Sequence, residues 1–354
     1  MLSSANGSRC RRHPKMWGLP TRCLAGEQHL GAQLSMQAAA VIRTQAVPVA
    51  RSNLSIVTIC TNQKRFKASL EGTPAALTAA IQADLTAQWI AVAQSLPRTT
   101  AAADLYAGRA FGLARTAAML TAAPLFILSA GLGLLAADTP VPAYGLTVSR
   151  SSAESILSKV IGPFDAGRWF AALTEAPHAV GWDKVFSPGT GRVLIALTRP
   201  YAAMIAPTLA SLPHDNLKRL RIFGAGLSTL LPPPVREALA PYDGRLDTVM
   251  PGTRSDFAQR ALLHFAQHIA VVARDQKGDA EAVKCALAPV RAPLRSTRRS
   301  ASDADILTLI KTRLTPGASA SRLLRQLRDV DHIACEQGRF TELFRKANAE
   351  DCAS

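Results

Sequence analysis

FILSAGLGLL, residues 126–135, predicts a short buried strand that ends in a turn of small residues. An amphipathic helix carrying DLYAGRAFGLAR (104–115) is expected just before it, and the proline- and tyrosine-containing loop VPAYGLTV (141–148) follows. Open α/β sheets place their ligand sites at the carboxyl ends of strands. We therefore expect a site region around this turn, at the end of a strand over Leu125–Ser129.

Strands and helices alternate on both sides of this segment. LSIVTIC (54–60), followed by the polar turn TNQKRFK (61–67), indicates a first buried strand, and VLIALT (193–198) and RIFGAG (221–226) indicate two more. Helical stripes of apolar residues separate these strands, over 73–95, 104–119, 201–212 and 256–274. Such alternation predicts a three-layer α/β sandwich with a mainly parallel sheet.

Composition divides the chain into four parts. Residues 1–52 are basic, rich in Ser and Ala and without periodicity, which predicts a disordered basic extension, or residues upstream of a later start at Met36. The α/β domain is expected over 54–275, and the Arg- and Pro-containing stretch 276–302 predicts a linker. Three short helices over 303–350 predict a C-terminal tail resembling a helix-turn-helix module.

The charge of the chain favours a polyanionic partner. Lys and Arg number 41 against 25 Asp and Glu, giving a net charge of +16. Nucleic acid is the expected partner, DNA before RNA, although a genome that favours Ala and Arg codons would produce the same excess. The contacts are expected from tail arginines: Arg295, Arg298, Arg299, Arg322, Arg325 and Arg328.

Two further features bear on the compartment. The six cysteines include no C-x-x-C pair, which suits a reducing cytoplasm. An uncharged run of 22 residues, between Arg115 and Asp138, is long enough to span a bilayer. Its many alanines, Pro124 and two glycines favour a buried strand instead, so no membrane partner is expected.

Side chains with binding chemistry gather at the expected strand ends. The candidates for binding a ligand or an anion are Cys60, Tyr106, Arg109, Ser129, Tyr144 and Tyr201. We expect Cys60, Arg109, Ser129 and Tyr144 to surround one cleft, because parallel strands end at the same edge of a sheet. Arg109 would bind the anion, the Ser129 turn would supply backbone donors, Tyr144 would act as a lid or stacking group, and Cys60 would form a wall. Ordinary packing is the alternative for each of these side chains.

Other motifs carry no clear chemistry. GAGLST (224–229) lacks the third glycine of a dinucleotide-binding turn and is followed by three prolines. His264 and His268 have metal-ligand spacing without a third ligand, and Ser129 does not lie in a G-x-S-x-G motif. No cofactor, metal or catalytic residue is therefore assigned.

The order of TICTNQK (58–64), DLYAGRAFGLAR, FILSAGLGLL and VPAYGLTV resembles a bacterial family labelled YaaA-like or peroxide-stress-like. The similarity covers about 54–235. It implies a three-layer α/β fold associated with nucleic acid and a distant likeness to uracil-DNA glycosylase-type folds. This chain departs from the family at Gly131 and Leu132, where relatives carry a polar or charged residue and a His or Tyr. If those side chains act in a reaction, the departure implies that this chain has lost the reaction and kept only binding.

Two functions of different class remain open. The first is a nucleic-acid-associated protein that binds DNA or RNA through its basic tail and the α/β cleft. The alternative is an enzyme acting on a nucleobase, nucleotide or modified nucleic acid, in the manner of a glycosidase or transglycosylase, with its pocket at the strand ends.

Overall fold

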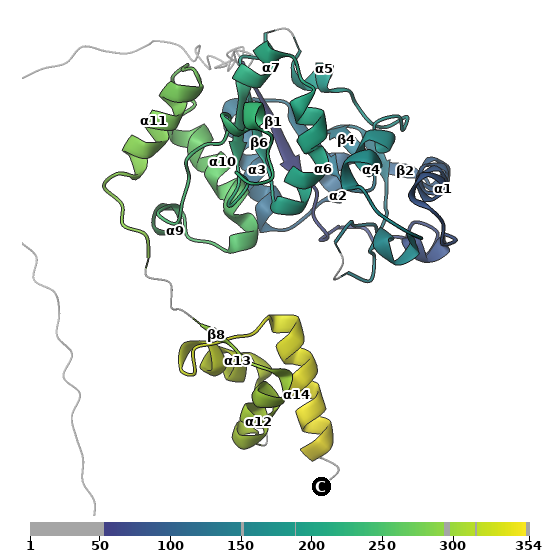
Figure 1. The fold of residues 1–354 in the computed structure, drawn as a ribbon, viewed down its shortest axis with the longest axis vertical. Helices are drawn as coiled ribbons and strands as arrows, with labels where there is room; N and C mark the ends of the chain where they lie inside the picture. The colour runs from purple at the N-terminus through teal and green to yellow at the C-terminus, as the bar shows by residue number, and fades with distance from the viewer. Residues whose placement is uncertain (1–52, 150–151, 188, 294–297, 316, 352–354) are drawn as a thin grey trace, which may run out of the picture. The chain divides into compact units, whose positions relative to one another are not determined.

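The computed structural model describes residues 53–149, 152–187, 189–293, 298–315 and 317–351 (Figure 1). These residues form an α/β domain and a C-terminal helical region, each of which is described here by itself. The expected extension over 1–52 lies outside the described residues. The central sheet is mostly parallel and flanked by helices, which confirms the predicted α/β sandwich.

The central sheet has five strands in the order β4-β3-β1-β6-β7. Their bounds are β1 (Leu54–Ile59), β3 (Leu125–Ser129), β4 (Gly133–Ala136), β6 (Arg192–Ala196) and β7 (Leu220–Phe223). β1 lies in the middle, with Ile56 paired to Leu125 of β3 on one side and to Leu194 of β6 on the other. All strands are parallel except β4, which runs antiparallel to β3. Both faces of β1 are buried, as its continuous apolar run predicts.

β4 was not predicted, because GLGLL was interpreted as a turn alone. The chain reverses over three residues and pairs Ser129 with Gly133. Gly133 has φ of +77°, a left-handed conformation that glycine adopts without strain. A side chain there would also meet the carbonyl oxygen of Leu173. The hairpin therefore depends on glycine at this position.

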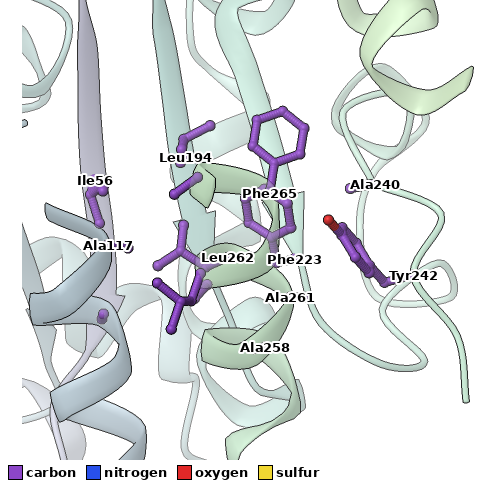
Figure 2. Close-up of a cluster of buried hydrophobic side chains, with 14 of the residues drawn as sticks. Ile56, Ala117, Leu194, Phe223, Ala240, Tyr242, Ala258, Ala261, Leu262 and Phe265 are labelled. Carbon is purple, nitrogen blue, oxygen red and sulfur yellow. The ribbon is translucent and has the colours of Figure 1, made fainter. Parts of the chain in front are cut away.

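One face of the sheet is covered by α3 (Arg109–Thr121) and α10 (Phe257–His268), which pack against each other. Figure 2 shows Leu262 and Phe265 of α10 among Leu194 and Phe223 of the sheet. Alanines of both helices, including Ala117, belong to the same buried cluster. Small side chains at these positions let the helices approach the sheet closely, so this face forms a continuous apolar core.

The opposite face is covered by α6 (Arg199–Ala210) and α4 (Ala166–Leu173). Met204 and Ile205 of α6 and Phe170 of α4 pack on the β-branched residues of β1 and β6. α1 (Gln82–Ser95) packs against α4, and its Trp89 belongs to a third cluster with Trp169. The sheet thus lies between two helical layers (Figure 1).

The remaining elements of the domain are short. They are η1 (Pro74–Ala76), β2 (Arg98–Ala101), α2 (Ala102–Leu105), β5 (Pro140–Pro142), η2 (Ile156–Lys159), α5 (Trp182–Val185), α7 (His214–Arg219), α8 (Pro233–Arg236), α9 (Leu246–Val249) and η3 (Arg254–Asp256). β2 and β5 pair with each other in a separate antiparallel ribbon.

Three helices have bounds in the structure that differ from those predicted. The helix expected over 104–119 is interrupted, because Gly108 has φ of +92° and starts a new helix, α3. The helix expected from residue 73 begins only at Gln82. The helix expected to reach residue 274 ends at His268.

The predicted linker is wrong over its first half. Residues Gln276–Leu287 form α11, whose Val283 and Leu287 are buried in the core beside α10. Asp279 of α11 is 1% exposed and accepts hydrogen bonds from Arg192 (3.1 Å) and Arg221 (2.7 Å). The sequence of α11 mixes charged residues with alanines, and its buried residues are Asp279, Val283 and Leu287, so it lacks the apolar stripe from which a buried helix is predicted. The α/β domain therefore extends through α11.

The C-terminal region contains the three helices that were predicted: α12 (Asp303–Arg313), α13 (Ala320–Asp329) and α14 (Gln337–Asp351). Two short strands, β8 (Arg299–Ser300) and β9 (Ile333–Ala334), pair in parallel. The helices share a small core of their own, which includes Ile310, Leu327 and Phe340.

None of the helices in the described ranges has the length and apolarity needed to cross a bilayer. The uncharged run after Arg115 is divided among α3, β3 and β4.

Candidate functional site

The strand order places a topological switch point between β1 and β6. The chain leaves β1 toward β3 on one side, and it leaves β6 toward β7 on the other side. Ligand sites in open α/β sheets usually lie at the carboxyl ends of two such strands. Here Cys60, which follows β1, and Tyr201, near the start of α6, meet at this point through a hydrogen bond of 2.9 Å between Sγ and Oη.

Three more predicted residues join this contact. The Tyr144 hydroxyl lies 2.9 Å from the Tyr106 hydroxyl and 2.6 Å from Ser129 Oγ, and it donates weakly to Cys60 Sγ at 4.0 Å. Five of the six predicted ligand-binding residues therefore form one connected cluster, the hydroxyl–thiol network (Cys60, Tyr106, Ser129, Tyr144 and Tyr201).

The network lies mostly in the interior, with Tyr201 partly exposed, and its phenols are uncharged. Burial, with a smaller contribution from Cys60, raises the pKa of Tyr106, Tyr144 and Tyr201 well above the ordinary value of a tyrosine. The phenols therefore stay protonated at any physiological pH. They can hold hydrogen bonds but do not act as phenolate bases.

The turn after Ser129 is closed by internal hydrogen bonds. Ser129 Oγ accepts from the backbone N–H groups of Gly131 (3.2 Å) and Leu132 (2.9 Å). The indole N–H groups of Trp89 and Trp169 donate to the carbonyls of Gly131 (2.6 Å) and Ala130 (2.7 Å). The expected anion cradle is therefore wrong, because its donors already have an acceptor.

Tyr144 is not a lid. Its side chain is in the interior, with the residue 1% exposed, and Gly131 lies directly against its ring. A Cβ at residue 131 would lie 2.6 Å from that ring, so glycine at this position is a packing requirement in this chain.

Arg109 does not join the network. Its guanidinium group donates to Asp256 Oδ2 at 2.9 Å and to the carbonyl of Pro251 at 2.5 Å. It lines a separate open cavity of about 370 Å³, together with the chain after β1 and the residues Thr253, Ser255 and Asp256. The expected single cleft is thus divided: Ser129 and Tyr144 lie in the interior, and Arg109 lies in an open cavity beside β1.

Asn62 and Gln63, the first two residues of the segment Asn62–Lys67, here termed the basic loop, line the same cavity. Two backbone hydrogen bonds of 2.9 Å, from Arg65 to Leu105 and from Ala107 to Gln63, fix this loop beside the residues that precede α3. Arg65, Phe66 and Lys67 are exposed, while Lys64 Nζ lies 4.5 Å from the centre of the Tyr144 ring. The sequence analysis treated this segment as a plain polar turn. The signal that could have identified it is an aromatic residue among three cations.

A wider groove of about 840 Å³ lies between α1 and α4. Its walls are mainly apolar and include Ala87, Ile90 and Phe164. Hydrogen bonds between the side chain of Gln82 and the backbone of Asp165 connect the two sides of the groove. No residue of the hydroxyl–thiol network lines it.

The predicted tail arginines differ in their surroundings. Arg298 donates to the Arg328 carbonyl and to Asp329, and Arg328 donates to the Cys335 carbonyl. Arg299 is exposed in β8, and Arg295 lies outside the described residues. Arg322 and Arg325 are exposed on α13, and neither has a hydrogen bond or ion pair within the described chain.

The charge of residues 298–351 is nearly balanced, with ten Lys and Arg against eight Asp and Glu. Ion pairs account for much of it: Arg298–Asp329, Lys311–Glu350, Arg313–Asp331 and Arg339–Asp303. Positive charge is left on α13, where two hollows of about 290 and 360 Å³ lie beside Arg325 and Arg322. Exposed cations also lie at Arg299 of β8 and at Arg345 and Lys346 of α14, but α13 is the helix on which two of them border hollows.

Comparison with known families gives one match. The model of a family of unknown function (DUF6884) matches residues 90–160. The matched segment includes Tyr106, Ser129 and Tyr144 but not the basic loop, Tyr201 or the C-terminal helices. No curated protein and no solved structure matches the chain.

Proposed function

We propose that this protein binds nucleic acid, DNA before RNA, through α13 of its C-terminal helical region. The observation that carries the proposal is the division of α13 into two faces. Leu323, Leu324 and Leu327 are buried, while Arg322 and Arg325 are exposed and unpaired among the described residues. Unpaired guanidinium groups on an exposed helix are suited to phosphate oxygens.

The local architecture supports the same conclusion. α12, a turn that includes Ser319, and α13 follow one another in helix-turn-helix order. The side chain of Ser319 makes no capping hydrogen bond, so the first backbone N–H groups of α13 remain available to a phosphate beside Arg322. The resemblance to the YaaA-like family, and a cytoplasmic location, are part of this proposal.

The enzyme alternative has a narrower basis. The cavity of about 370 Å³ beside β1 is at the edge of the sheet where α/β enzymes place their pockets. The phenols of the hydroxyl–thiol network, however, stay protonated, and they supply no base. The binding function is therefore the better supported of the two.

The test is the affinity for duplex DNA of the full chain and of the variant Arg322→Ala/Arg325→Ala, measured by fluorescence anisotropy over a range of salt concentrations. Loss of two phosphate contacts should weaken binding at least about tenfold and reduce the salt slope by about two. Arg168→Ala, which removes an arginine with an 86% exposed side chain from α4, is the matched control. If Arg322→Ala/Arg325→Ala and Arg168→Ala had the same DNA affinity and the same salt dependence, α13 would not be the binding element.

A further inference from the structure

The α/β domain has a surface of its own that fits nucleic acid. Phe66 is 50% exposed and lies between Arg65 and Lys67, which are both exposed. A single exposed apolar residue is ordinary on a protein surface. A half-exposed aromatic ring between two cations is the arrangement that single-strand-binding proteins use, since a base stacks on the ring while the cations follow the backbone.

The loop presents this ring from a fixed platform. Two backbone hydrogen bonds join the loop to the residues before α3. In addition, Thr61 Oγ1, just before the loop, donates to the carbonyls of Gln63 and Ala107, each at 2.8 Å. These bonds hold the base of the loop from two directions. Little conformational entropy would therefore be lost when a ligand contacts Phe66.

The surroundings of the loop contain charges of both signs: the exposed Asp104, which pairs with Arg115, precedes the Leu105 carbonyl that Arg65 contacts, whereas the side toward the cavity carries arginines. Arg109 has a 53% exposed side chain in the adjacent cavity, and η3, which contributes to a wall, carries the exposed Arg254. Among the residues lining this cavity, the carboxylate is Asp256, which is 4% exposed and already binds both Arg109 and Arg260. An incoming phosphate would thus meet cations and a carboxylate that is already neutralised.

We infer that the basic loop and the cavity beside it bind single-stranded nucleic acid, with an unpaired base stacked on Phe66 and the adjoining phosphates held by Arg65, Lys67 and Arg109. The inference rests on the proposed function in one respect, the association with nucleic acid. The strand must be unpaired, because bases in a duplex are already stacked on their neighbours and do not present a free face to the ring.

The experiment measures the affinity of the full chain for a single-stranded oligothymidylate, an oligouridylate and a duplex of the same length. Phe66→Ala should weaken binding of the single strands about tenfold, the effect of losing one base–aromatic stack. Phe66→Trp keeps an aromatic ring at this position and should bind the single strands as tightly as the unaltered protein does. Leu70→Ala, which removes a 73% exposed apolar side chain a few residues further along, is the matched control and should bind as the unaltered protein does. The two single strands distinguish DNA from RNA as the preferred source of the unpaired base.

The outcomes separate this inference from the proposed function. If Phe66→Ala binds single strands normally while Arg322→Ala/Arg325→Ala loses duplex affinity, the inference is overturned and the proposed function stands. If Phe66→Ala loses single-strand affinity while the α13 variant binds duplex normally, the inference stands and the role of α13 fails. If the unaltered protein binds neither probe, both are wrong.

Discussion

The two ends of the central sheet use charge in opposite ways. At the amino ends of β6 and β7, Arg192 and Arg221 are buried and share the carboxylate of Asp279. At the carboxyl ends, the interior is filled by the hydroxyl–thiol network, and the cations Arg65 and Lys67 are outside it, exposed to solvent. Both ends are rich in polar side chains, and at the carboxyl end the exposed Arg65 and Lys67 lie on a loop that backbone hydrogen bonds hold in place.

This difference shows why a concentration of polar residues does not by itself identify a site. A buried ion pair whose partners satisfy one another is a structural element, and so is a hydroxyl cluster whose donors all have acceptors. Unpaired charge on a fixed, exposed segment is the feature that points to recognition.

The largest effect is expected at the amino end. Asp279→Ala leaves two buried guanidinium groups without a carboxylate and should lower the free energy of unfolding by about 3–5 kcal/mol. Urea denaturation monitored by circular dichroism measures it. Asp215→Ala, which removes an exposed partner of Lys218, is the control and should change the stability by less than about 0.5 kcal/mol. Similar small losses in both variants would show that α11 is not an integral part of the domain.

A smaller loss is expected at the carboxyl end. Ser129→Ala removes the acceptor for two buried backbone N–H groups and a partner of Tyr144, so it should lower the free energy of unfolding by about 2–3 kcal/mol. Ser95→Ala is the control: it removes an exposed hydroxyl that donates to the Val92 carbonyl, and it should lower the free energy of unfolding less than Ser129→Ala does. A normal stability together with lost nucleic-acid binding would give the network a recognition role that its burial argues against.

The third effect depends on pH, is absent at neutral pH and concerns α10. Burial, with the neighbouring His268, lowers the pKa of His264 to about 4. In the unfolded chain this histidine binds a proton near its ordinary value of 6.5, so the folded state loses stability as the pH falls from 6.5 toward 4. His264→Gln should make the urea midpoint less dependent on pH in this window, whereas His214→Gln, at an exposed position, should not. An unchanged pH profile in His264→Gln would mean that His264 is protonated in the folded protein.

Much of the sheet could be predicted from the sequence. Leu125–Ser129 and Leu54–Ile59 are continuous apolar runs bounded by polar or small residues, and such runs are buried strands in α/β proteins. The convergence of Cys60, Ser129 and Tyr144 also followed from the rule that parallel strands end at one edge. Pattern and topology were sufficient for these features.

The remaining features depend on tertiary contacts. α11 could not be predicted, because Asp279 is stabilised by arginines more than 50 residues earlier in the chain. Whether a tyrosine at a strand end faces a ligand or the core depends on neighbours such as Trp89 and Trp169, which sequence spacing does not reveal. The exposed position of Phe66 likewise results from backbone bonds to the segment before α3.

The central claim is that the carboxyl edge of the sheet and α13 contact nucleic acid and that the amino edge does not. Ultraviolet crosslinking of the full chain to oligothymidylate and to duplex DNA, followed by mass spectrometry of the peptides, tests it directly. We expect crosslinks to the single strand in Asn62–Lys67, centred on Phe66, and crosslinks to the duplex in Ala320–Asp329. Crosslinks concentrated at Lys218 and Arg219, near the amino end of β7, with none in these two segments, would contradict the account.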